Sequence, residues 1–348
     1  MKSTFFTFLS LFLLFSCKNE IKTTSEDWQI VSENVQFKED GNTFQLKSGK
    51  FDYTIPTSKL PFKNVILLNA SLVGYFTELD LEGDIIGISS PEYVYSEKVH
   101  QLVKSGKIQN VGNEQKYNLE KIIALKPDAI FTNYIASFEN TYDLIKKNGI
   151  EIIFLDEYLE QNPLNKTKYL LVFGKLFNNE KKAVSKVEDI QKRYDSLKIV
   201  AKTSASKPIV LANEMYGNQW FLPGGQSNLA QFIFDANATY INAGNSETNA
   251  IPMSFEEVFV KGQKAEYWVN IGNHQNKKEL LQINPNYTKL PVFNEGKLYT
   301  IDRKTQGKSN DYFESGVVRA DVVLKDYIRI FHPELLPNYK LTYFKELK

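Results

Sequence analysis

The stretch Val111–Tyr134, VGNEQKYNLEKIIALKPDAIFTNY, decides the fold, because it joins a capped short helix directly to a strand. Asn118 is a good N-cap for a helix with apolar side chains at helical spacing, and Lys126-Pro127-Asp128 ends that helix. The apolar run Ala129–Thr132 then predicts a buried strand. The stretch is therefore one unit of an α/β fold.

The same alternation continues on both sides of this stretch. Strands are predicted at 65–69, 85–88, 152–155, 209–212, 267–271 and 297–301. Helices are predicted at 71–79, 96–103, 141–147, 227–235 and 255–260, with another from 163 onward and a closing helix over 312–331. Alternation of this kind predicts parallel sheets covered by helices, which bind ligands beyond the carboxyl ends of their strands.

A long helix is predicted in the middle of the chain. Residues 175–207 contain neither Gly nor Pro, and apolar side chains recur at steps of three and four from Ala183 to Ala201. We place this helix at 177–203. About 25 helical residues span roughly 38 Å, which is enough to cross from one domain to another.

The N-terminus has the features of an exported lipoprotein. An apolar run, Phe5–Phe15, follows Met1-Lys2 and predicts a signal peptide over residues 1–16, too short to span a bilayer. Leu14-Phe15-Ser16-Cys17 resembles a bacterial lipobox, so we expect lipidation of Cys17, the only cysteine. The alternative is an ordinary cleaved signal with an incidental cysteine. Residues 17–27 then form a polar tether, and residues 28–60 an added N-terminal unit of antiparallel strands.

Several phrases of the sequence resemble cluster III periplasmic substrate-binding proteins, which deliver ferric siderophores, haem or cobalamin to ABC importers. Asn118–Asp128 resembles the signature of their first lobe, and similar phrases from the second lobe occur at 220–225, 254–258, 289–302 and 331–335. The resemblance implies two doubly wound α/β lobes, 61–176 and 204–348. One long interlobe helix would join them, and a ligand cleft would lie between them.

The resemblance also suggests how the protein docks. In the family, one glutamate from each lobe pairs with arginines of the two permease subunits. The matching positions are Glu120 and Glu256, with Glu257 as a competitor for the second. Each glutamate also has a simpler explanation, because acidic residues in a first helical turn complement the helix dipole. The expected partners are an ABC permease dimer with its ATPase subunits.

Ligand contacts are expected from loops of both lobes that face the cleft. Arg303 favours an anionic chelate, because guanidinium groups suit such ligands. If the cargo is haem, His274 is the candidate ligand of its iron. A solvated loop histidine is an equally good explanation of this residue. The candidate ligand residues are Ser71, Tyr75, Tyr93, Tyr95, Asn133, Tyr134, Glu214, Tyr216, Trp220, His274 and Arg303.

Several function classes find no support in the sequence. It contains no GxSxG elbow, Walker loop, HExxH pair or cysteine cluster, so we expect neither an enzyme nor a resident cofactor. The three histidines lie far apart, which argues against a bound metal ion. Nitrogenase-like oxidoreductases share the fold but hold clusters through cysteines. Cleavage before Cys17 removes Lys2 and brings the formal charge from +1 to zero, which implies no nucleic-acid partner.

We therefore expect a monomeric, lipid-anchored binding protein in the periplasm or on the cell surface. Its expected cargo is a ferric siderophore, with cobalamin or haem as alternatives. The alternative from a different class of function is a surface lipoprotein that keeps the fold but has no part in transport.

Overall fold

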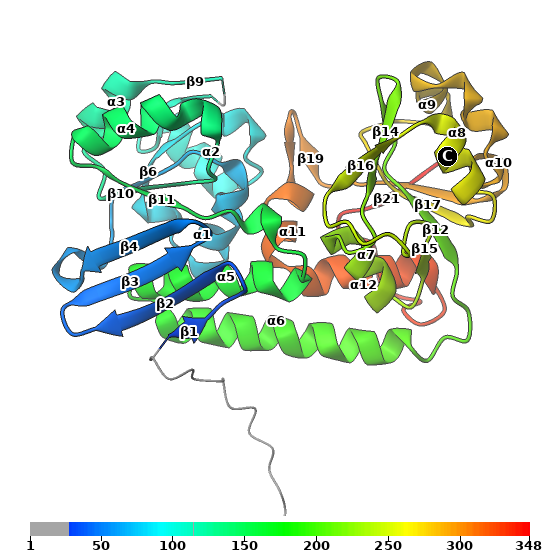
Figure 1. Ribbon diagram of the computed structural model, residues 1–348, viewed down its shortest axis with the longest axis horizontal. Coiled ribbons are helices and arrows are strands. Elements are labelled where there is room, and N and C mark those ends of the chain that lie inside the picture. Colours follow the sequence, from blue (N-terminus) through cyan, green and yellow to red (C-terminus); the bar gives the residue numbers. More distant parts are fainter. Residues whose placement is uncertain (1–27, 114) are drawn as a thin grey trace, which may run out of the picture.

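The computed structural model describes residues 28–113 and 115–348. The predicted signal peptide, the tether and the lipidation site Cys17 lie outside these residues. The described chain forms two α/β lobes that stand side by side above the long helix α6 (Glu180–Ala201) (Figure 1). This arrangement confirms the predicted fold class.

The sheet of the first lobe is entirely parallel, in the order β11-β10-β5-β6-β7. Its strands are β5 (Val65–Leu67), β6 (Ile85–Ile88), β7 (Gln109–Asn110), β10 (Ala129–Thr132) and β11 (Glu151–Phe154). The lobe also contains a short hairpin, β8 (Gly112–Asn113) and β9 (Lys116–Tyr117). Its helices are α1 (Val73–Leu79), α2 (Glu97–Lys104), α3 (Leu119–Leu125), α4 (Glu139–Lys147) and α5 (Pro163–Leu176).

Both faces of this sheet are buried, as a doubly wound fold requires. Apolar side chains of α1, α2 and α5 cover one face, whereas those of α3 and α4 cover the other. The four-stranded N-terminal sheet also packs on the first of these faces, and Phe44 and Leu46 belong to the same core. This antiparallel sheet consists of β1 (Gln29–Ile30), β2 (Val35–Asp40), β3 (Thr43–Ser48) and β4 (Phe51–Pro56).

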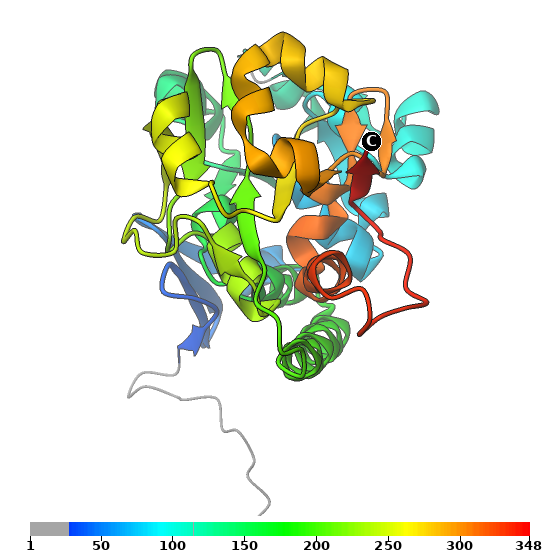
Figure 2. The same ribbon diagram turned by 90° about the vertical axis from the view of Figure 1, so that its right-hand side faces the viewer.

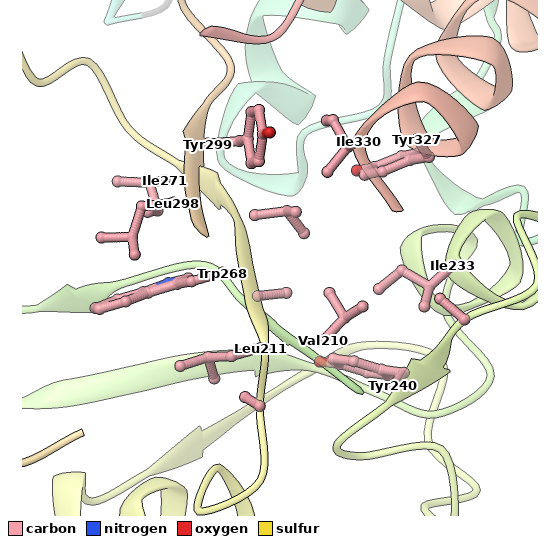
Figure 3. Close-up of a cluster of buried hydrophobic side chains, with 14 of the residues drawn as sticks. Val210, Leu211, Ile233, Tyr240, Trp268, Ile271, Leu298, Tyr299, Tyr327 and Ile330 are labelled. Atoms are coloured by element: carbon pink, nitrogen blue, oxygen red, sulfur yellow. The ribbon is translucent and has the colours of Figure 1, made fainter. Parts of the chain in front are cut away.

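The second lobe has a five-stranded sheet in the order β15-β12-β17-β18-β21. All neighbours are parallel except the C-terminal strand β21, which pairs antiparallel with β18. Successive side chains of β12 point to opposite sides, so that Val210 packs with Tyr240 while Leu211 packs beneath Trp268 (Figure 3). The strands are β12 (Ile209–Ala212), β15 (Thr239–Tyr240), β17 (Tyr267–Ile271), β18 (Lys297–Thr300) and β21 (Lys345–Leu347).

A second, three-stranded sheet and several helices complete this lobe. The small sheet has the order β13-β14-β16, formed by β13 (Met215–Tyr216), β14 (Gln219–Pro223) and β16 (Ala250–Met253). A further hairpin consists of β19 (Thr305–Gln306) and β20 (Ser309–Asn310). The helices are α7 (Asn228–Asp235), α8 (Phe255–Lys261), α9 (Lys277–Ile283), α10 (Pro291–Glu295), α11 (Ser315–Val318) and α12 (Ala320–Phe331).

Helix α6 joins the lobes by contributing to both cores. Its first half adds Val187 and Ile190 to the core of the first lobe, and its second half adds Tyr194 and Ala201 to the core of the second. The helix has 22 residues and is therefore roughly 33 Å long. It begins at Glu180 rather than at residue 177, because Asn178 adopts a left-handed conformation with φ of 51° and separates it from α5.

The lobes are also connected a second time, by a segment that the sequence analysis assigned to one closing helix. That helix is broken at Arg319 into α11 and α12. Helix α11 leaves the second lobe, and Val318 lies in the core of the first lobe. The hydroxyl of Thr167 on α5 donates to the carbonyl oxygen of Val318 at 2.7 Å. Helix α12 then packs beside α6, as the view along both helices shows (Figure 2).

Glu314 stabilises this second connection at the contact between the two lobes, which we call the seam. Its carboxylate accepts hydrogen bonds from the backbone N–H groups of Tyr95, at 2.6 Å, and Ser96, at 3.1 Å, in the first lobe. Its side chain is almost fully buried, and this burial raises the pKa of Glu314 to about 7. Arg319 adds an ion pair with Glu78 of α1 at 3.4 Å. The lobes are thus held by α6 and by a buried polar contact.

Within residues 28–113 and 115–348, no helix combines the length and the apolar character that crossing a bilayer demands.

Candidate functional site

A buried polar cluster lies at the carboxyl ends of three strands of the first lobe. Asn133 follows β10, Ser71 lies in the short 3₁₀ helix after β5, and Glu157 lies in the one after β11. The Ser71 hydroxyl donates to Glu157 at 2.6 Å, and the Asn133 amide donates to the other carboxylate oxygen at 2.7 Å. Asn69 donates in turn to Asn133. Two predicted ligand residues, Ser71 and Asn133, are therefore joined by a carboxylate that the sequence analysis missed.

The carboxylate of Glu157 is buried without a direct ion pair. Burial raises its pKa, and the hydrogen bonds from Ser71 and Asn133 offset only part of that effect. Lys166 of α5 is the nearby cation, and burial lowers its pKa while Glu157 and Glu160 act in the opposite direction. Glu160 is committed elsewhere, because it accepts hydrogen bonds from Ser32 and Tyr169.

The second lobe presents a carboxylate–imidazole pair at the corresponding edge. Glu214 follows β12, and one of its carboxylate oxygens lies 2.8 Å from Nε2 of His274, which follows β17. Gly272 lets the carboxylate approach, because a Cβ atom at that position would be 2.7 Å from the other Glu214 oxygen. Burial raises the pKa of Glu214, and the proximity of His274 opposes the shift. Glu214 and His274, both predicted from the sequence, are thus brought together.

Exposed aromatic side chains accompany these polar groups in both lobes. Tyr93 follows β6 and is 47% exposed, and Tyr216 in β13 is 83% exposed. Both were predicted from the sequence, whereas Tyr158, Phe221 and Phe313, which are exposed to a similar degree, were not. Phe234 of α7 is exposed as well, but it lines a separate pocket beside α6 and β15. Tyr158 directly follows Glu157, and Phe313 directly precedes Glu314. Exposed aromatic faces of this kind are suited to contact with a ligand.

Two predicted ligand residues belong to the core instead. Trp220 has no exposed surface and stacks on Trp268, with ring centroids 5.3 Å apart. Tyr75 is also fully buried, and its hydroxyl donates to the backbone carbonyl oxygen of Lys166 at 2.9 Å. Neither side chain has surface with which to contact a ligand in this structure, so their assignment as ligand residues is corrected.

Two further predicted tyrosines are occupied by contacts within the protein. The Tyr134 ring packs against Phe51 of the N-terminal sheet, and Lys50 lies 3.8 Å from the ring centroid. Tyr95 donates its backbone N–H to Glu314. Its ring remains half-buried, with the ammonium of Lys304 at 5.8 Å. Tyr134 is therefore part of the packing between the N-terminal sheet and the lobe, and Tyr95 part of the seam.

Arg303 lies apart from the Glu214–His274 pair. It lines a cavity of about 440 Å³ that is enclosed by β18, the end of α12 and the C-terminal segment. No residue of the first lobe lines this cavity. Its other basic side chains are Lys297, Arg329, Lys340 and Lys345. The expectation that Arg303 provides a positive charge to a cargo between the lobes therefore finds no support in its position.

The two predicted docking glutamates lie on the same side of the molecule. Their helices, α3 and α8, are at the side opposite α6 (Figure 1). Glu120 and Glu256 are both exposed in the first turns of these helices. Glu257, the competitor, is engaged in a capping box, because its carboxylate accepts the backbone N–H of Ser254 at 2.7 Å. Glu256 is therefore the more available of the two adjacent carboxylates.

In the part of the chain that the structure describes, no group of three or more His, Cys, Asp or Glu side chains is placed to hold a metal ion.

Comparison with known proteins agrees with this architecture. A family model described as "Periplasmic binding protein" matches residues 65–305, which is well over half of the chain. An uncharacterized lipoprotein of Methanocaldococcus jannaschii is 25% identical over 297 residues, which cover 82% of this chain and 69% of that protein.

Two solved structures share the fold. A periplasmic haem-binding protein of Pseudomonas aeruginosa superposes with a TM-score of 0.61 at 15% identity, over 82% of this chain and 98% of that protein. The siderophore-binding protein FhuD of Vibrio cholerae, bound to Fe³⁺–Desferal, gives a TM-score of 0.56 at 17% identity, over 79% and 98% of the two chains.

Proposed function

Because the chain belongs to the periplasmic binding protein family, in which proteins bind substrates rather than transform them, we propose that it captures a ferric siderophore and delivers it to an ABC permease. The family and the lipoprotein relative support a location outside the cytoplasm. Attachment through a lipid on Cys17 is part of the proposal. One or more acyl chains there would keep the protein near its permease.

The observation that carries the cargo assignment is the set of exposed aromatic side chains contributed by both lobes. Tyr93 and Tyr158 come from the first lobe, and Tyr216, Phe221 and Phe313 come from the second. Large aromatic faces left in water cost free energy that a bulky organic ligand can recover by covering them. A bare metal ion would leave these faces uncovered. A metal held within an organic chelate therefore fits better.

Haem and cobalamin remain alternatives within the same fold. Haem ligation through Nε2 of His274 would require that nitrogen to leave Glu214, which lies 2.8 Å away, and ligation through Nδ1 would displace the contact of that nitrogen with Glu279 at 3.8 Å. In the first case the half-buried carboxylate of Glu214 would lose its imidazole partner, which is costly. A siderophore needs no such exchange, because its own oxygen atoms saturate the iron. This difference favours the siderophore.

We further propose that Glu120 and Glu256 set the docking register on the permease. Their exposure and their common side of the molecule support this role. Charged contacts at the rim of an interface act mainly on encounter and on specificity. The contact should therefore weaken as the salt concentration rises.

The double variant Glu120→Ala/Glu256→Ala is expected to bind its cargo normally but to need about tenfold more binding protein to stimulate the permease. Removing two charged contacts of about 0.7 kcal/mol each should weaken binding to the permease about tenfold. The measurement is the ATPase activity of the reconstituted transporter at increasing concentrations of loaded binding protein, at low and high salt.

Glu188→Ala is the matched control, because Glu188 is also an exposed helical glutamate but lies on α6, at the opposite side. The control should behave as the unaltered protein. If the double variant stimulates the ATPase as well as the control does, the docking assignment is wrong. If the unaltered protein neither binds a chelate nor stimulates any permease, the protein is a surface lipoprotein outside transport.

A further inference from the structure

The loops that follow four of the five first-lobe sheet strands have a one-sided charge, whereas the segment after β7 contains Lys116. We call residues 68–72, 89–96, 133–138 and 155–162 the first-lobe strand-end loops, since they follow β5, β6, β10 and β11. They contain no Lys or Arg. Their charged residues are Glu92, Asp156, Glu157 and Glu160. In a protein whose acidic and basic residues almost balance, this separation gives these four loops a negative formal charge.

The second lobe likewise has no Lys or Arg directly after β12 and β17. The segment after β12 contributes Glu214, and the loop after β17 contributes His274 as its only basic side chain. Cations occur only after β18. Of these, Lys304 is paired with Asp311 at 2.8 Å, and the Lys308 ammonium lies 5.6 Å from the Tyr93 ring centroid.

Arg303, the remaining cation after β18, lines the separate cavity beside the C-terminal segment. Lys304 and Lys308 therefore bring positive charge to the rings of Tyr95 and Tyr93 in the first lobe, and Asp311 offsets that of Lys304.

Two cations from other elements offset part of this negative charge. Lys166 of α5 faces Glu157 and Glu160, and Lys50 of the N-terminal sheet faces Asp156. Glu92 is exposed, and Glu214 has only His274 beside it. Burial raises the pKa of Asp156, Glu157 and Glu214, and the nearby Lys50, Lys166 and His274 offset only part of that effect. A positive charge brought by the cargo would offset more of it.

The exposed aromatic side chains favour the same sign. The faces of Tyr and Phe rings carry partial negative charge and attract cations, typically by about 0.5–2 kcal/mol for each contact. Tyr93 already contacts an ammonium, that of Lys308. The ring faces and the carboxylates thus act in the same direction.

We propose that the cargo is a neutral or cationic metal chelate, such as a ferric trihydroxamate, and that an anionic chelate such as a ferric tris-catecholate is rejected. This inference rests on the proposed function and specifies its substrate class. Glu214 and Glu92 are the residues that select the sign of the charge. This preference for a neutral or cationic chelate replaces the sequence-based expectation that Arg303 favours an anionic one.

The test uses one ferric trihydroxamate in three forms that differ in a single terminal group, together with one ferric tris-catecholate. The free ammonium form is cationic, the acetylated form neutral, and the succinylated form anionic. Binding to the purified protein is measured by titration calorimetry at two salt concentrations. Trp28, Trp220 and Trp268 are all buried, so intrinsic tryptophan fluorescence is a poor substitute.

We expect the cationic and neutral forms to bind with a Kd about tenfold lower than the anionic form. Glu214→Gln and Glu92→Gln should each reduce that difference at least about threefold. Glu92 is exposed, so its replacement keeps the test valid if Glu214→Gln fails to fold. The control Glu188→Gln, on α6, should leave the difference unchanged.

Each other result has a distinct meaning. If the anionic form binds as tightly as the cationic one, or if only a ferric tris-catecholate binds, the charge selection is wrong while the proposed function stands. A preference that neither glutamate variant reduces would refute the role of these residues. If none of the chelates binds, the proposed function fails, and the inference fails with it.

Discussion

Replacing Gly74 with alanine is expected to lower the free energy of unfolding by about 2–4 kcal/mol, because the new methyl group has no room in the seam between the lobes. Gly74 lies on α1 directly beneath the backbone of Glu314. A Cβ atom on residue 74 would overlap the Glu314 carbonyl oxygen and lie 2.9 Å from the carbonyl carbon. Both neighbours are backbone atoms, so the segment that carries α11 must move. Denaturant unfolding monitored by circular dichroism measures the loss.

Gly83→Ala is the matched control for this substitution. A Cβ atom at Gly83 meets nothing within 4 Å. Its stability should therefore change by less than about 0.5 kcal/mol. Limited proteolysis adds a local readout, because a displaced α11 should expose the chain near Arg319 to trypsin. If Gly74→Ala is as stable as Gly83→Ala and equally resistant to trypsin, the seam is less tightly packed than the structure indicates.

Raising the pH from about 5 to about 7.5 is expected to destabilise the protein through Glu314 by up to about 3 kcal/mol. The folded-state pKa of this carboxyl is about 7, above its ordinary value of 4.5, because burial disfavours the charged form. The folded state therefore holds the proton more tightly than the unfolded chain does. The Glu314 contribution is fully present below the ordinary pKa and is lost as the pH rises through 7.

The variant Glu314→Gln isolates this effect. Glutamine keeps the shape of the side chain but does not ionise, so its unfolding free energy should depend less on pH across this range. The difference between the two proteins, measured by denaturant titration at several pH values, reports Glu314 alone. Glu97→Gln, an exposed carboxylate in the first turn of α2, should reproduce the pH dependence of the unaltered protein. Equal pH slopes for Glu314→Gln and the unaltered protein would contradict the assignment.

The sequence was sufficient for the elements whose signals are local. Strands β6, β10, β12 and β17 have the predicted bounds, because each is a short apolar run next to a turn or a helix cap. Helix α3 likewise begins after Asn118, whose side chain accepts the backbone N–H of Lys121. The closing helix was predicted as one piece because the break at Arg319 is imposed by contacts with the first lobe. Such contacts leave no local mark in the sequence.

The candidate site was partly predictable, and its errors have identifiable causes. Glu157 and Tyr158 follow β11 as Asn133 follows β10, so applying the strand-end rule to β11 as well would have found them. In β14 the side chains alternate, which buries Trp220 and exposes Phe221. Tyr75 is buried because its ring packs against Tyr169 and Phe173 of α5, and only the fold reveals that. The Arg303 side chain lies in a cavity formed with the C-terminal segment, which is far from it in the sequence.

The position of Val318 has a consequence for how the protein is made. The interior of the first lobe is completed by a residue that follows most of the second lobe in the sequence. A nascent chain that contains only the first lobe therefore lacks part of its core, and we expect it to stay loosely packed until the segment with Val318 has been synthesised. Such a delay would suit a polypeptide that is exported unfolded, because the first lobe becomes stable only after most of the second lobe has followed it.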